Sequence, residues 1–359
     1  MSPKNILYIG PYREDSNRGY YSYYNIKGLI KGGHNIKTIP RFSNRCINNI
    51  ISDDIVHLEN NNFDHYDICI QHSDSLQYSY NKSFKLNIGI YDFANFDPNP
   101  IINSSFYLLD KIIVSSKNKF KILQDTLSPY NYNKLVYLPQ LADFEEIDNQ
   151  ETNTLEWIEN RFYFYCELDF SEQYDWEKLI YVYLTTFMNK NAGLVIKTKN
   201  LNDPKKIDLI KKQIYDIAKE ANIKPIPQAM PLVLNNVFDK QELATIYKNT
   251  HCLIDINKAN EQCYSSVHFA YFNKPIICNR HLTTASYFKN AIKTESMLCN
   301  SSMAYYEDIS NGTLYNYYHS INPESLREAM FDIYSRKNQR QNNYEEVEQH
   351  SITKINDLI

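Results

Sequence analysis

The feature that most constrains this chain is an apolar segment, a glycine, a polar loop and a helical stretch, in an order that then recurs. Residues 6–9 are apolar, Gly10-Pro11 ends them, and a polar loop leads to Gly19. A helix is expected over residues 20–31, ended by the carboxyl cap Gly32-Gly33, with a strand at residues 34–39. This βαβ unit requires a parallel sheet with a right-handed crossover.

The same order continues to the end of the chain. Further strands are predicted at residues 68–70, 86–91, 111–114 and 135–138, and then at 162–165, 193–197, 231–234, 252–256 and 275–278. A polar, acidic stretch over residues 143–154 separates the two groups, as expected for a linker. The fold class is therefore α/β, with two Rossmann-like, doubly wound parallel-sheet domains facing a central cleft. We place them at residues 1–148 and 149–337, followed by a polar tail at 338–359.

Composition excludes several other classes of protein. The formal charge of −4 gives no basic field for nucleic acid or an anionic membrane. The seven cysteines show no zinc or disulfide spacing. No segment reaches the roughly 18 apolar residues of a membrane span, and the first residues do not form a signal peptide, so we expect a cytoplasmic protein.

The polar segment between the strands at 252–256 and 275–278 is a candidate ligand site. It contains Asn260, Glu261, Ser265, Ser266 and His268. Such a strand-to-helix loop lies at the carboxyl edge of a parallel sheet, where the start of a helix offers unpaired N–H groups to an anion. A diphosphate-linked sugar suits this position.

Four stretches together resemble the GT-B glycosyltransferases, and among them the retaining family 4. They are residues 9–34, residues 110–116 with 136–139, residues 179–187 with 194–197, and residues 242–277. The resemblance implies a nucleotide-sugar donor in the second domain and an acceptor in the first. It also implies retention of the anomeric configuration, with no metal and no cofactor besides the donor itself. The absence of a DxD carboxylate pair at a strand end agrees with metal independence.

Two departures from the family pattern concern the donor. Asn260 stands where the first glutamate of the family motif belongs and His268 where the second belongs, with Glu261 one position off. His268 could hold the ribose through a ring nitrogen, although a helix histidine bonded to a carbonyl is the alternative. The stretch 172–175 lacks the Arg and Lys that clamp the diphosphate in family members.

The leaving diphosphate nevertheless needs positive charge or aimed N–H donors. Lys197, at the end of its strand, is the nearest replacement, as donor ligand and as catalytic cation, unless it is a surface lysine. Arg18 and the helix start at Ser265 and Ser266 could contribute, and the two serines could equally be helix caps. Gly19 would let the backbone approach the diphosphate, or would simply allow a tight turn.

Two further candidate catalytic residues end strands of the first domain. Asp92 follows the strand at 86–91, and His72 follows the strand at 68–70. Both would face the cleft and the acceptor. The alternative for Asp92 is a solvated carboxylate in a turn.

Two other functions stay open. The missing clamp and the replaced glutamates favour a catalytically inactive binding protein that keeps the GT-B scaffold. A viral-type DNA-base glycosyltransferase has the same fold, but the net negative charge argues against it. The acceptor is unidentified: a glycan, a protein, a small molecule or, less in keeping with the charge, DNA.

Overall fold

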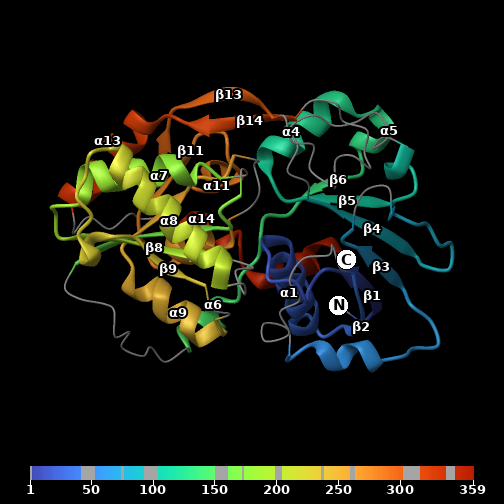
Figure 1. The fold of residues 1–359 in the computed structure, drawn as a ribbon. Coiled ribbons are helices and arrows are strands. Elements are labelled where there is room, and N and C mark those ends of the chain that lie inside the picture. Colours follow the sequence, from blue (N-terminus) through green and yellow to red (C-terminus); the bar gives the residue numbers. More distant parts are fainter. Residues whose placement is uncertain are drawn as a thin grey trace. The chain divides into compact units, whose positions relative to one another are not determined.

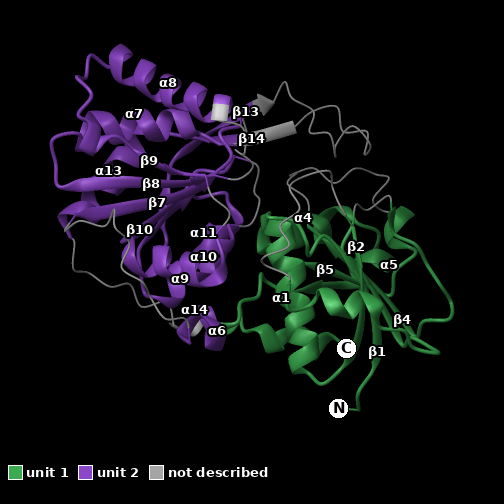
Figure 2. Ribbon diagram, turned by 60° about the horizontal axis from the view of Figure 1, so that its bottom comes forward, with its two compact units in different colours: residues 1–143, 300–318, 348–359 green, residues 144–299, 319–347 purple. Residues whose placement is uncertain are grey.

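The computed structural model describes most of the chain. The described residues are 2–41, 53–73, 77–92, 104–149, 161–171, 174–198, 204–235, 238–258, 263–301, 316–336 and 344–359. They form two compact units (Figure 2): unit 1 comprises residues 1–143, 300–318 and 348–359, and unit 2 comprises residues 144–299 and 319–347. The first boundary lies five residues before the predicted one. Residues 348–359, taken from the sequence for part of a tail, belong to unit 1.

Unit 1 is built on a six-stranded parallel sheet with the order β2-β1-β3-β4-β5-β6. Its strands are β1 (Asn5–Gly10), β2 (Asn35–Pro40), β3 (Ile68–Gln71), β4 (Leu86–Tyr91), β5 (Lys111–Val114) and β6 (Leu135–Tyr137). All neighbouring pairs are parallel. The strand order reverses between β1 and β3, and in such sheets ligands bind outside the carboxyl ends of the strands at this point.

Helix α1 (Asn17–Lys31) follows β1, and ten of its fifteen residues are buried. Ser16 caps its start by accepting the N–H of Gly19. The 3₁₀ helix η4 (Ile352–Leu358) packs on α1, where Asn356 donates to the carbonyl of Gly28. A Cβ at Gly28 would collide with the backbone of Ile352, so the glycine allows this close approach.

Unit 2 contains a second six-stranded sheet, with the order β12-β11-β10-β7-β8-β9. Its strands are β7 (Phe162–Leu168), β8 (Ala192–Thr198), β9 (Leu232–Leu234), β10 (Cys252–Asp255), β11 (Ile276–Asn279) and β12 (Ile292–Thr294). Starting from β7 as the first strand, this is the Rossmann order 3-2-1-4-5-6. The order reverses between β7 and β10, which places the expected ligand crevice at the carboxyl ends of these two strands.

The two faces of the second sheet are covered by different helices (Figure 2). Alternate residues of β7, beginning with Phe162 and Phe164, join the apolar core beneath α7 (Trp176–Phe187), α8 (Pro204–Glu220) and α13 (Pro323–Ser335). The intervening residues face α9 (Lys240–Asn249) and α10 (Tyr264–Tyr271), where Tyr165 contacts Tyr247 and stacks on Phe269. Since β7 and β8 are in register, Glu167 and its neighbour Lys197 lie on this second face.

The remaining elements complete the described fold (Figure 1). They are α4 (Lys117–Thr126), α5 (Pro129–Tyr132), α6 (Phe144–Asp148), α11 (Thr283–Tyr287), α14 (Tyr344–Glu348), η1 (Val56–Asn60), η3 (Pro227–Ala229) and the two-stranded sheet of β13 (Ser296–Ser301) and β14 (Asn316–Ile321). Helix α6 falls within the predicted linker. None of the helices in the described part of the chain combines the length and apolarity that crossing a membrane requires.

Candidate functional site

In unit 1, the candidate residues gather at the reversal of strand order. His72 immediately follows β3, and its N–H donates to the carbonyl of Ile9 on β1 at 2.8 Å. Asp92 follows β4 in the same way. Because the carboxyl ends of parallel strands meet at one edge, these two side chains lie together, with His72 Nε2 3.9 Å from Asp92 Oδ2.

The imidazole of His72 is completely enclosed, since its side chain has 0% exposure. Its Nδ1 is 2.6 Å from Ser22 Oγ on α1, and the ring makes a T-shaped contact with the ring of Tyr21. Burial, together with the charge of Arg18, holds the pKa of His72 well below its ordinary value, so the ring is neutral. A neutral, oriented imidazole can donate or accept one further hydrogen bond.

Arg18 and Gly19 also lie in unit 1, on the first turn of α1. Arg18 is half-buried and acts on His72 electrostatically. The N–H of Gly19 is bonded to Ser16, and a Cβ at Gly19 would collide with the carbonyl oxygen of Glu14. The structure therefore supplies a packing reason for this glycine, and its N–H already has an acceptor.

In unit 2, Lys197 ends β8 and is 2% exposed. Its ammonium forms no hydrogen bond or ion pair with any residue that the structure describes. Removing a cation from water without compensation is costly, so an ammonium in this situation is well placed to bind an anion. It lies beside Glu167, which accepts hydrogen bonds from the hydroxyls of Tyr165 and Tyr247.

Helix α10 follows β10 in the chain and covers the face of the sheet on which Glu167 and Lys197 lie. Its N-cap residue, Cys263, forms no side-chain cap. Ser265 and Ser266 are fully buried: Ser266 Oγ donates to the carbonyl of Cys263, and Ser265 Oγ contacts the Cys263 thiol. Neither serine is the N-cap residue of this helix. Asn260 and Glu261 lie outside the described residues.

His268 is buried within α10, with both ring nitrogens facing Tyr264. The Tyr264 hydroxyl is 3.1 Å from Nε2, and the Tyr264 carbonyl oxygen is 3.3 Å from Nδ1. Burial lowers the pKa of His268 to about 4. The arrangement matches the alternative that the sequence left open, a helix histidine bonded to a carbonyl.

The buried histidines predict loss of stability in acid. Burial lowers the pKa of both His268 and His350 to about 4, and His350 Nδ1 donates to the carbonyl of Gln140. Because the unfolded chain binds protons at these histidines below about pH 6.5, stability is complete above that pH and falls as the pH approaches 4. Each histidine contributes about 3 kcal/mol to the loss. Urea denaturation at pH 7.5 and at pH 4.5 measures this loss. An equal free energy of unfolding at the two pH values would contradict the burial of two neutral histidines.

A charge cluster at the start of α7 was not found from the sequence. Asp175 accepts the N–H of Ile321 at 2.6 Å and the hydroxyl of Ser320 at 2.8 Å. The ammonium groups of Lys178 and Lys258 each lie 3.6 Å from the same carboxylate. The sequence shows no cation within residues 172–175, whereas the fold brings two lysines to this place from α7 and from the loop after β10.

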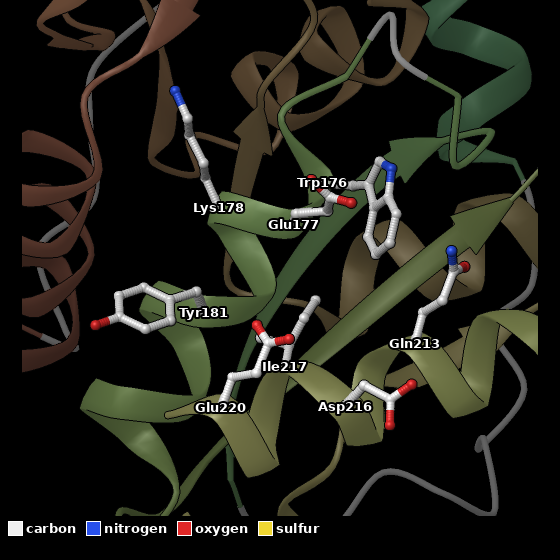
Figure 3. Close-up of a pocket in the computed structure, with 8 residues that line it drawn as sticks. All are labelled: Trp176, Glu177, Lys178, Tyr181, Gln213, Asp216, Ile217 and Glu220. Atoms are coloured by element: carbon white, nitrogen blue, oxygen red, sulfur yellow. The ribbon is translucent and has the colours of Figure 1, made fainter. Parts of the chain in front are cut away.

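An open groove of about 420 Å³ lies between α7 and α8 (Figure 3). Trp176 and Ile217 provide apolar lining, and Glu177, Asp216 and Glu220 contribute carboxylates. The one cation among the described lining residues, Lys178, donates to the carbonyl of Ile321 and pairs with Asp175. This negative charge does not suit a diphosphate.

Compared by sequence, the chain matches no family model and no curated protein. Compared by structure, it is similar over nearly its whole length to several solved proteins. A glycosyltransferase from Rickettsia africae matches with a TM-score of 0.61 and 11% identity, covering 100% of this chain and 97% of that one. Anabaena HepE in complex with UDP and glucose matches with a TM-score of 0.61 and 8% identity, covering 99% of this chain and 98% of that one. Sucrose-phosphate synthase from Thermosynechococcus elongatus gives 0.64 and 10%, covering 98% and 96%.

These neighbours are GT-B glycosyltransferases, and the identities are low enough that the likeness concerns the fold alone. Both six-stranded parallel sheets, each with its own reversal of strand order, agree with it. The chain therefore has the GT-B fold that the sequence pattern indicated.

Proposed function

We propose that this protein is a glycosyltransferase that takes a nucleotide-sugar donor in unit 2 and an acceptor in unit 1. The observation that carries the proposal is Lys197: a buried lysine at the carboxyl edge of the second sheet, whose ammonium forms no hydrogen bond or ion pair with any residue that the structure describes. The likeness to HepE, solved with UDP and glucose and also with UDP-glucose, supports a nucleoside diphosphate as that anion.

The chemistry required of this site is modest. The acceptor oxygen forms a bond to the anomeric carbon, the bond from that carbon to the diphosphate breaks, and the electron pair leaves with the nucleoside diphosphate. Lys197 stabilises the negative charge that develops on the leaving oxygens. Retention, supported by the resemblance to family 4, implies attack from the face that the diphosphate leaves. The acceptor proton can then pass to the departing phosphate, so few protein side chains need act as acid or base.

A catalytically inactive, sugar-binding protein is the second candidate. It is favoured by His268, whose ring nitrogens both face Tyr264, and by Lys178 and Lys258, which are already paired with Asp175. An enzyme releases free nucleotide from its donor, whereas a binding protein does not.

Donor screening distinguishes the two. The full chain is incubated with UDP-, GDP- and ADP-sugars, and released nucleotide is measured by mass spectrometry. We expect release from one nucleotide class, at least tenfold above the rate of the Lys197→Met variant. Donor binding without release supports the inactive protein, and neither binding nor release overturns the proposal.

A further inference from the structure

The groups on either side of the His72 ring favour one position for its proton. Ser22 Oγ lies 2.6 Å from Nδ1, and a serine hydroxyl can donate to a ring nitrogen. The Asp92 carboxylate lies 3.9 Å from Nε2, and its negative charge favours a proton on the nitrogen that faces it. Nδ1 is then the acceptor, and the ring proton is on Nε2.

The Nε2–H group faces Asp92, yet it does not reach the carboxylate. The 3.9 Å between Nε2 and Oδ2 exceeds a hydrogen bond, and Nε2 is a buried atom with no hydrogen-bond partner among the described residues. A buried polar atom without a hydrogen-bond partner requires an explanation, because native structures contain few such atoms. A single oxygen atom about 2.8 Å from each group spans the separation.

The two sides of this gap specify what can fill it. His72 presents a donor, and Asp92 presents a carboxylate, which accepts only. A hydroxyl both accepts and donates, so it satisfies both sides. A phosphate or carboxylate oxygen would meet Asp92 with like charge, and an ammonium group has no lone pair for His72.

We infer that His72 and Asp92 together hold one hydroxyl group of a neutral, polyhydroxylated acceptor, His72 donating to its oxygen and Asp92 accepting its proton. This rests on the proposed function and names the class of acceptor for it. Ser22 is a positioning residue, because it acts by setting the His72 tautomer. Access is from the Asp92 side, since the Asp92 side chain is 8% exposed and the His72 side chain is not exposed at all.

Nitrogen-15 NMR of the histidine rings shows directly which ring nitrogen of His72 carries the proton. His72 is expected as the Nε2–H tautomer, and His72→Gln assigns its resonance. His350 provides an internal control, because its Nδ1 must donate to the carbonyl of Gln140 and should appear as the opposite tautomer. Finding His72 as the Nδ1–H tautomer, or as an imidazolium at pH 7, would overturn the inference.

Small probes at one ionic strength test the selectivity. Glycerol should shift the His72 Nε2–H resonance, and inorganic phosphate should not. Asp92→Asn replaces the carboxylate by an amide of nearly the same shape, so the glycerol response should require at least fivefold more glycerol. A resonance shift of equal size with phosphate contradicts the inference. The absence of a shift with either probe also contradicts it, because the gap then holds water alone.

The NMR result is independent of donor binding, so the two proposals can fail separately. A chain that releases nucleotide from a donor but shows the Nδ1–H tautomer retains its proposed function and loses this acceptor site. A chain with the expected tautomer and glycerol response but no donor binding loses the proposed function.

Discussion

Replacing Lys197 with methionine is expected to weaken nucleotide-sugar binding about 100-fold, equivalent to about 2.7 kcal/mol, while making the protein more stable. Methionine fills similar space without charge. Because Lys197 is buried and its ammonium forms no hydrogen bond or ion pair with a described residue, its replacement should raise the free energy of unfolding by about 1 to 3 kcal/mol. Donor affinity should thus fall while the free energy of unfolding rises, as expected for a side chain that serves ligand binding and not the stability of the fold.

Lys274 is the matched control. Its ammonium donates to the carbonyls of Tyr247, Lys248 and Thr250 at the end of α9, so its bonds are satisfied within the protein. Lys274→Met should lower stability by about 2 kcal/mol, because buried carbonyls lose their donor, and should change donor affinity less than twofold. Calorimetric titration and urea denaturation measure the two effects. If both variants lose affinity equally, or if Lys197→Met is the less stable of the two, Lys197 is not the anion ligand.

The second large effect is expected at Asp175. Its carboxylate joins the start of α7, the last residues of β14 and the loop after β10, through Ile321, Ser320 and the two lysines. Asp175→Ala leaves the cations and the Ile321 N–H without their anion, in surroundings where the Asp175 side chain is 3% exposed. We expect a loss of about 3 to 5 kcal/mol in the free energy of unfolding.

An exposed ion pair provides the comparison. Asp332 pairs with Arg336 at 2.8 Å, one turn along α13, with both side chains about half exposed. Asp332→Ala should cost less than about 1 kcal/mol, because solvent screens the pair. Both variants are measured by urea denaturation at pH 7 and low salt. Equal losses would mean that the Asp175 cluster contributes no more than a surface contact.

The strands and their order in the chain could be predicted because buried parallel strands are continuous apolar runs. Residues 192–198 illustrate this, since the predicted strand at 193–197 lacks only the residue at each end. His72 and Asp92 were found from one rule, that residues after the strands of a parallel sheet meet at its carboxyl edge. The C-terminal residues were not predicted to pack, because they are polar. The bare backbones of Gly28 on α1 and of Gly32 at its end make room for them.

What the sequence could not give is the set of contacts between residues far apart in the chain. Ser22 and His72 are 50 positions apart, and Asp175 and Ser320 are 145 apart. No local pattern records such pairs. His268 shows that a position in a motif does not determine the orientation of the side chain. Its place in the motif suggested a ligand contact, whereas its rotamer turns both ring nitrogens towards Tyr264, one helical turn earlier.

The most direct test of the central claim, that unit 2 binds a nucleotide-activated sugar through Lys197, is calorimetric titration of the full chain with UDP-, GDP- and ADP-sugars beside the Lys197→Met variant. The account predicts saturable binding of one nucleotide class to the wild-type chain and a loss of about 100-fold in the variant. No binding of any donor to the wild-type chain, or equal binding to both proteins, would contradict it.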